Sequence, residues 1–211
     1  MTRGRIIIGA DLLLGGFMRR LFPLFALLAL VAAAPSLAFA DAEGDRIACF
    51  SLGNENYKDT SKIDPGMAAC TRMINGGKFK DKALASLYRA RASWKEKKGN
   101  LDAALADYNI SIRIEPDNVE SYDYRADVYQ DKGDLDAALE NYNQATKIDP
   151  TYAAAYFSRG RIYEKKGDLA KAREEYNAAI AVPTVNRIAQ WAQDNARARL
   201  KALEGATDKK D

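Results

Sequence analysis

Four carboxylates in one short segment have the spacing of groups that act together. Glu120, Asp123, Asp127 and Asp131 follow one another at intervals of three, four and four residues, so on an α-helix they would form one stripe. Such a stripe attracts a cationic ligand, and a close pair such as Asp123 and Asp127 could in principle perform acid–base catalysis. The alternative is a solvated helix face that binds nothing.

The rest of the sequence gives little support to an enzyme. The chain has no histidine among its 211 residues, which removes imidazole metal ligands and the histidine that activates serine or cysteine nucleophiles. No glycine-rich phosphate loop or nucleophile motif accompanies the carboxylates. We therefore predict a non-catalytic protein without cofactors or metal ions.

The N-terminal 40 residues have the pattern of a secretory signal peptide. Arg19 and Arg20 precede an apolar run from Leu21 to Ala34, and Ala38-Phe39-Ala40 is a small-x-small cleavage site. We predict that residues 1–40, with Met18 as an alternative start, are removed and that the protein is periplasmic or secreted. The alternative is a membrane-tethered assembly factor in which residues 21–40 are retained, although prolines interrupt the apolar run.

Cleavage would also change the charge of the protein. Removing the four arginines and the single aspartate of residues 1–40 from the 32 basic and 29 acidic residues leaves 28 of each. A chain without net charge has no general attraction for nucleic acid or for an anionic membrane. We therefore expect neither a nucleic-acid partner nor a membrane contact after cleavage.

Cys49 and Cys70 are the only two cysteines. An even number of cysteines in an exported chain favours a disulfide, whereas two thiols are too few for a four-ligand structural zinc site. No Cys-x-x-Cys motif suggests redox catalysis. The alternative is that Cys70 is only a small buried residue.

The sequence repeats with a period of 34 residues, and the repeated elements would position the carboxylates. The period is carried by Gly99, Gly133 and Gly167, by Leu101, Leu135 and Leu169, by Ala104, Ala138 and Ala172, by Tyr108, Tyr142 and Tyr176, and by Arg91, Arg125 and Arg159. A strict period of this length is typical of a helical solenoid, in which one helix pair cannot bury its own apolar face.

Turn and capping residues divide each period into two helices. In the unit 119–152, the first helix is predicted over residues 119–132 with Asp117 as its cap, and Gly133 ends it. Asp134 is the predicted N-cap of the second helix, which ends before Pro150. The same pattern predicts units over residues 85–118 and 153–186, capped by Asp81 and Thr151.

These units resemble the tetratricopeptide repeat (TPR) family. The residues that match the family pattern are Tyr88, Ala92, Gly99, Ala104, Tyr108 and Pro116 in the first unit, Tyr122, Ala126, Gly133, Ala138, Tyr142, Ala145 and Pro150 in the second, and Tyr156, Gly160, Gly167, Ala172, Tyr176 and Ala179 in the third. The resemblance implies an all-α, right-handed α-α superhelix of about 3.5 repeats plus a C-terminal capping helix. It also implies a non-catalytic scaffold that binds a protein or peptide in a concave groove.

Both flanks of the repeats are predicted to be caps. Residues 41–84 form an N-terminal cap with a degenerate half repeat, whose helix starts at Asp64-Pro65 and places Cys70 in the small-residue position. The run Ala68–Ile74 resembles a segment that precedes the repeats, together with an upstream cysteine, in some secreted bacterial members of the family. Residues 187–204 form a capping helix that covers the last repeat with Ile188, Trp191, Ala192, Ala196, Leu200 and Leu203, and residues 205–211 form a disordered tail.

By the geometry of the family, the first helix of each repeat lines the groove. The candidate groove residues are Arg89, Ser93 and Lys97 in the first unit, Glu120, Asp123, Asp127 and Asp131 in the second, and Phe157, Arg161 and Glu164 in the third. The carboxylate-binding mode of some family members needs asparagine on these helices, and none lies there. We therefore expect a protein or peptide partner of basic character and a monomeric scaffold.

Arg91, Arg125 and Arg159 occupy a position at which the family more often has leucine. We predict a structural role, in which each guanidinium meets Asp107, Asn141 or Glu175 on the facing second helix. A ladder of ligand-binding arginines is the alternative.

Overall fold

The computed structural model describes residues 42–51 and 60–207. The chain divides into two units, Met1–Gly44 and Asp45–Asp211, and the helical residues 45–50 and the helices that follow them belong to the second. The predicted signal peptide over residues 1–40 and the last residues of the predicted tail, 208–211, lie outside the described residues.

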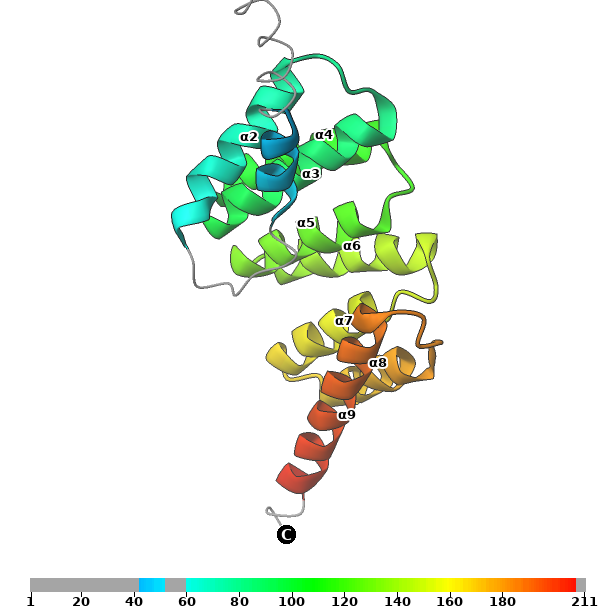
Figure 1. The fold of residues 1–211 in the computed structure, drawn as a ribbon. Helices are drawn as coiled ribbons and strands as arrows, with labels where there is room; N and C mark the ends of the chain where they lie inside the picture. Colours follow the sequence, from blue (N-terminus) through cyan, green and yellow to red (C-terminus); the bar gives the residue numbers. More distant parts are fainter. Residues whose placement is uncertain (1–41, 52–59, 208–211) are drawn as a thin grey trace, which may run out of the picture. The chain divides into compact units, whose positions relative to one another are not determined.

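The second unit is a succession of helix pairs (Figure 1). Its helices are residues 45–50 of a helix that begins at residue 42, the short 3-10 helix η2 (Thr60–Lys62), α2 (Ile63–Asn75), α3 (Asp81–Lys97), α4 (Leu101–Ile114), α5 (Val119–Asp131), α6 (Leu135–Ile148), α7 (Ala153–Lys165), α8 (Leu169–Ala181) and α9 (Arg187–Thr207). Helices α3 and α4, α5 and α6, and α7 and α8 pack as pairs, and each second helix also contacts the next pair. The described residues contain no strand, so the predicted all-α fold is confirmed.

A left-handed glycine ends the first helix of every repeat. Gly99, Gly133 and Gly167 have φ angles of 81°, 82° and 79°, a conformation that a side chain disfavours. Asp134 and Asp168 then cap the second helices by accepting hydrogen bonds from the amides of residues 137 and 171, each at 3.1 Å. The predicted helix–turn–helix unit and its Asp134 cap are therefore correct.

Several predicted helix starts are wrong by one or two residues. Asn118 rather than Asp117 caps α5, since its side chain accepts the amide of Ser121 at 2.9 Å. Tyr152 rather than Thr151 precedes α7, and no side chain caps that helix. Asp81 is the first residue of α3 rather than its cap. At the front, η2 leads directly into α2, so the helix already includes Asp64 instead of starting from it.

Each repeat closes around one buried tyrosine on its second helix. Tyr108, Tyr142 and Tyr176 are fully buried, and each packs against a small residue on its own first helix. A Cβ atom added to Gly160 would lie 2.5 Å from a ring carbon of Tyr176. The small residue at this position therefore lets the two helices approach closely.

The three periodic arginines tie the helix pairs together as predicted. Arg91 makes a bidentate pair with Asp107, with N–O distances of 2.7 and 2.8 Å. The Nε atom of Arg125 donates to Asn141 at 2.7 Å, and that of Arg159 donates to Glu175 at 3.0 Å. We call these three side chains the arginine ladder. Arg125 and Arg159 also contact the preceding repeat, where they donate hydrogen bonds to Asn109 at 2.7 Å and to Asn143 at 2.9 Å, respectively.

The front of the repeats is held by a disulfide. Cys49 and Cys70 are joined, with their Cα atoms 4.9 Å apart, and both are completely buried beside Leu87 and Trp94. The indole Nε1 of Trp94 donates to the carbonyl of Cys49 at 2.9 Å. The crosslink therefore attaches the helix over 42–50 to α2 and α3.

Helix α9 continues the repeat register as a fourth first helix. Its residues Ala189 and Ala196 are buried, as are the residues 34 positions earlier, Ala155 and Ile162. Gln193 takes the position of the arginine ladder, but it accepts a hydrogen bond from the hydroxyl of Thr184 and donates one to the carbonyl of Val182. The helix also continues to Thr207, so residues 205–207 of the predicted tail are helical.

The predicted apolar face of α9 is partly wrong. Ile188 and Trp191 remain 48% and 53% exposed, whereas Ala192, Ala196 and Leu203 are buried against α7 and α8. A face of small residues lets α9 pack closely on the last pair, which leaves the bulky side chains at its edge.

Candidate functional site

The predicted groove residues lie on one side of the three first helices, α3, α5 and α7, which we call the groove face. The structure does not gather them into one site. It divides most of them among a small N-terminal pocket, a central acidic cluster and a larger C-terminal pocket, while Lys97 is exposed at the last turn of α3, outside both pockets.

The N-terminal pocket has a volume of about 150 Å³. It is lined by Cys49, Phe50, Ser86, Arg89, Ala90, Ser93, Glu120 and Tyr124. The guanidinium of Arg89 forms an ion pair with Glu120 at 2.8 Å and donates to the cap residue Asn118 at 3.1 Å. Arg89 and Glu120 are therefore occupied with each other across α3 and α5, and the pocket has little uncompensated charge.

The central cluster consists of Glu96, Asp123, Asp127 and Asp131. The alternative of a solvated helix face does not hold for Asp123, which is only 6% exposed. Its Oδ2 accepts the hydroxyl of Tyr152 at 3.0 Å, whereas its Oδ1 is buried and has no hydrogen-bond partner. Of the four carboxylates, only that of Asp131 at the end of α5 belongs to an exposed residue.

The carboxylates of the cluster raise one another's pKa. Burial, followed by repulsion from Asp127, raises the pKa of Glu96 to about 7. Burial and the charge of Asp127 raise the pKa of Asp123 well above its usual range, and burial is also the main cause of the raised pKa of Asp127. The tyrosine hydrogen bonds oppose these shifts without cancelling them.

The cluster is supported by tyrosines that recur with the repeat. Tyr142 donates to Asp127 at 2.5 Å and Tyr108 donates to Glu96 at 3.1 Å. In the third repeat, Tyr176 donates to Glu164 at 2.8 Å. The phenol that fills each helix pair therefore also orients one carboxylate of the groove face.

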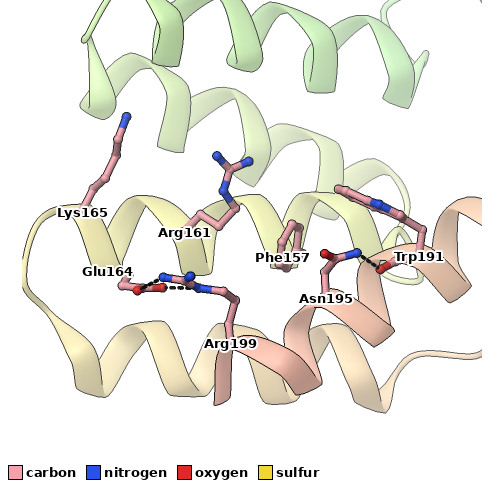
Figure 2. Close-up of a pocket in the computed structure, with 7 residues that line it drawn as sticks. All are labelled: Phe157, Arg161, Glu164, Lys165, Trp191, Asn195 and Arg199. Carbon is pink, nitrogen blue, oxygen red and sulfur yellow. Dashed lines mark hydrogen bonds and ion pairs between the residues drawn. The ribbon is translucent and has the colours of Figure 1, made fainter. Parts of the chain in front are cut away.

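The C-terminal pocket is the larger one, with a volume of about 480 Å³ (Figure 2). It is lined by Phe157, Arg161, Glu164, Lys165, Trp191, Asn195 and Arg199. Trp191 stands edge-on to Phe157, with ring centroids 5.3 Å apart and planes at 83°. The guanidinium carbon of Arg161 lies over the Phe157 ring, 5.9 Å from its centroid. Arg199 forms an ion pair with Glu164.

Three lining residues of this pocket are absent from the predicted site. Trp191, Asn195 and Arg199 lie on α9, which was predicted only to cap the last repeat. They follow Phe157, Arg161 and Lys165 by 34 residues each. Extending the period past residue 186 would have placed them on the groove face.

The described part of the chain contains no group of three or more His, Cys, Asp or Glu side chains placed to bind a metal ion. None of its helices combines the length and the apolar character that crossing a bilayer requires.

The comparisons with known proteins support the TPR family. Residues 126–167 match the family model described as TPR repeat, and residues 153–182 match the one described as tetratricopeptide repeat. No curated protein matches the chain.

The solved structures that are similar to this chain share its fold. The crystal structure of MamA aligns with a TM-score of 0.55 and 21% identity over 78% of this chain and 87% of that chain. A tetratricopeptide repeat protein from Parabacteroides merdae aligns with a TM-score of 0.57 and 16% identity over 76% and 61% of the two chains. The Sgt2 TPR domain from Aspergillus fumigatus has a TM-score of 0.50 and 18% identity, over 59% and 84%.

At these identities the likeness shows the fold alone, and it confirms the predicted superhelix of helix pairs. Such a fold is typically a non-catalytic interaction scaffold, and neither matched family model describes an enzyme.

Proposed function

We propose that the protein is an exported, non-catalytic scaffold that binds a protein or peptide along its groove face and holds a basic side chain of that partner at the central acidic cluster. The TPR fold supports the interaction role. The signal-peptide pattern of residues 1–40 and the disulfide between Cys49 and Cys70 support export.

The proposal that the partner is basic rests on the unpaired oxygen of Asp123. Its Oδ1 is buried without a hydrogen bond, and the carboxylates of Asp127 and Glu96 repel it. A buried acceptor without a donor costs about 1–3 kcal/mol. An ammonium or guanidinium group of a partner, placed beside the less buried carboxylates of Asp127 and Asp131, would supply the missing positive charge.

Binding of a cation should depend on salt and on pH. Ionic strength screens the attraction between the cluster and an approaching basic segment. Because the pKa of Glu96 is raised to about 7 and those of Asp123 and Asp127 are raised as well, the cluster gains negative charge as pH rises from 5 to 8. The affinity for a lysine or arginine peptide should therefore rise over this interval, with release of protons on binding.

The direct test replaces the carboxylates of buried Asp123 and partly buried Asp127 by amides of the same shape. Asp123→Asn with Asp127→Asn should weaken binding of an acetylated, amidated peptide carrying two lysines by roughly tenfold or more in fluorescence anisotropy titrations. The matched control is Asp102→Asn with Asp136→Asn, which makes the same charge change at side chains that are 88% and 85% exposed on α4 and α6. Equal weakening by both double variants, or equal binding of a glutamate peptide, would reject the acidic cluster as the binding site.

Amides suit this test better than charge reversal. Reversal of Asp123 to lysine would place a cation at a buried position beside Tyr152, and unfolding could then be mistaken for lost binding. Crosslinking in the periplasmic fraction, followed by isolation of the complex, would identify the natural partner.

The proposed export can be tested separately, by identifying the first residue of the mature protein. Mass spectrometry of protein isolated from cells should find Asp41 as the first residue. Retention of residues 21–40 would instead favour the second candidate, a membrane-tethered assembly factor with the same groove face.

A further inference from the structure

The C-terminal pocket differs from the acidic cluster in both charge and apolar surface. Arg161, Lys165 and Arg199 bring three positive charges to its lining, against the single negative charge of Glu164. Within the described part of the chain, Arg161 and Lys165 make no hydrogen bond or ion pair, although both are exposed beside a carboxylate.

Glu164 is already committed to other partners. It pairs with Arg199 and accepts the hydroxyl of Tyr176 at 2.8 Å. Burial alone would raise the pKa of Glu164, but the hydrogen bonds from Arg199 and Tyr176 outweigh burial and lower it. Glu164 therefore stays ionised and holds Arg199 in place, which leaves the charges of Arg161 and Lys165 available to a ligand.

The apolar end of the pocket is formed by two aromatic rings. Phe157 is only 4% exposed, whereas Trp191 is 53% exposed although it packs edge-on against Phe157. The amide of Asn195 donates to the carbonyl of Trp191 at 2.7 Å within α9. Figure 2 shows Trp191 at one end of the pocket and Lys165 at the other, with the guanidinium of Arg161 between them.

We propose that this pocket binds a carboxylate-bearing segment of a protein partner in which the acidic group stands next to a large apolar side chain. Arg161 and Lys165 would receive the carboxylate, and the rings of Trp191 and Phe157 would cover the apolar side chain. The planar guanidinium of Arg161, held over Phe157, is suited to bidentate contact with a carboxylate.

The rest of the groove face argues against a polyanion such as a nucleic acid. Arg161 is close enough to Asp127 for its charge to lower the pKa of that carboxyl group, so the pocket borders the acidic cluster. A strand with a negative charge at every residue would be repelled there. A peptide can instead alternate its charges, with an acidic and apolar end at α7 and α9 and, on the proposed function, a basic residue at α5.

The two tryptophans allow the pocket to be tested by itself. Trp191 is exposed and lines the pocket, whereas Trp94 is 3% exposed in the N-terminal cap. The indole N–H signals in a ¹H–¹⁵N correlation spectrum of protein made from the full chain therefore give one reporter and one internal reference. The probe is the acetylated, amidated peptide Ser-Glu-Phe-Glu-Ser, which carries no basic residue and so reports on this pocket independently of the acidic cluster.

We expect the Glu-Phe-Glu peptide to shift the Trp191 signal and leave that of Trp94 unchanged. Peptides with Gln-Phe-Gln or Glu-Ala-Glu should bind roughly tenfold more weakly, because one lacks the charge and the other the apolar group. The proposed occupant is an acidic side chain rather than a chain end, so a Gln-Phe peptide with a free C-terminal carboxylate should bind as weakly as the Gln-Phe-Gln peptide. Equal binding of this peptide and the Glu-Phe-Glu peptide would contradict the proposal.

Variants then locate the binding energy. Arg161→Gln should weaken the Glu-Phe-Glu peptide roughly tenfold, whereas Lys201→Gln should leave its affinity within about twofold, because Lys201 is exposed on α9 and does not line the pocket. The unchanged Trp94 signal verifies that each variant is folded. The proposal is wrong if the Trp191 signal does not move, if Lys-Phe-Lys binds as well as Glu-Phe-Glu, or if the two variants weaken binding equally. Binding of this probe and binding of the lysine peptide can fail separately, so the two proposals remain distinguishable.

Discussion

The arginine ladder and the groove face use the same helices in opposite ways. On the ladder, Arg91, Arg125 and Arg159 keep one residue type at intervals of 34, and each finds its acceptor on the facing second helix. At a neighbouring position of the groove face, the period instead reads Arg89, Asp123, Phe157 and Trp191. One set of positions repeats because every helix pair must close in the same way, and the other varies because each repeat presents a different surface.

This contrast separates stability from binding in a way that substitutions can test. A change on the ladder should affect the free energy of unfolding strongly and leave peptide affinity alone. A change on the groove face should alter peptide affinity and leave the free energy of unfolding unchanged or even raise it. The reason is that these side chains are expected to find their partners in the bound peptide rather than in the fold.

The largest expected effect is at Asp107, the buried acceptor of Arg91 in the arginine ladder. Asp107→Ala would leave Arg91 and Lys95 without the carboxylate that pairs with both, at 2.7 and 2.6 Å, and should lower the free energy of unfolding by about 3–5 kcal/mol. Asp102→Ala on the same helix removes an exposed pair with Lys132 and should cost at most about 1 kcal/mol. Urea unfolding curves measure both, and similar losses would contradict a structural role for the ladder.

A smaller effect is expected where the two helices of a repeat touch. Ala138 is completely buried against Ala126 and Tyr142, so Ala138→Leu should cost about 1–3 kcal/mol through overpacking. Ala137 is only partly buried, and Ala137→Leu should cost clearly less. Equal shifts of the denaturation midpoint would show that the repeat register is wrong.

The acidic cluster should make the folded state less stable as pH rises, whereas carboxylates with lowered pKa values make it more stable as pH rises. Glu96, with a pKa of about 7 when folded, faces Asp127 and Asp131 as well as Tyr108 and Lys97. Its unfolded pKa lies near 4.5, so between these values the folded state binds more protons than the unfolded state. Stability from this group is therefore complete below pH 4.5 and is lost as pH rises to 7.

The variant Glu96→Gln isolates that contribution. Relative to the parent protein, it should gain roughly 1–2 kcal/mol between pH 4.5 and pH 7.5, because it no longer pays for ionising a buried carboxylate. Thermal or urea unfolding at several pH values measures the difference. A difference that is constant over this range would mean that Glu96 ionises normally.

The smallest effect is a gain in stability at the candidate site. Asp123→Asn removes a buried charge while keeping an oxygen for the hydroxyl of Tyr152, and it should raise the free energy of unfolding by about 1 kcal/mol. The same change should weaken the lysine peptide. A variant that is both less stable and fully able to bind would place Asp123 with the ladder rather than with the groove face.

Much of the architecture was predictable because it repeats. Three copies of each turn glycine and each core tyrosine define the helix pairs. The arginine ladder was predictable because the acceptors Asp107, Asn141 and Glu175 lie 34 residues apart, as the arginines do. Helix starts were less predictable, because Asn118 and Asp117 are both good caps and only the hydrogen bond to the amide of Ser121 distinguishes them.

The candidate site was predictable only in outline. The groove positions of α3, α5 and α7 follow from the repeat, but the pocket beside α9 was not foreseen, because the degenerate sequence of α9 hides its relation to the other first helices. Trp191 was expected to help cover the last repeat, and it does contact Phe157 edge-on, but it stays 53% exposed while Ala192 and Ala196 are buried.

By itself the sequence determined the period, the helix pairs and the arginine ladder, since these depend on spacing along one chain. Only the tertiary structure decided that Asp123 is buried with an unpaired oxygen, because its surroundings include Tyr152 from the start of the next repeat. It likewise decided that Arg161 and Lys165 share a pocket with Trp191. Burial and charge compensation depend on neighbours that are distant in the sequence, and no local pattern encodes them.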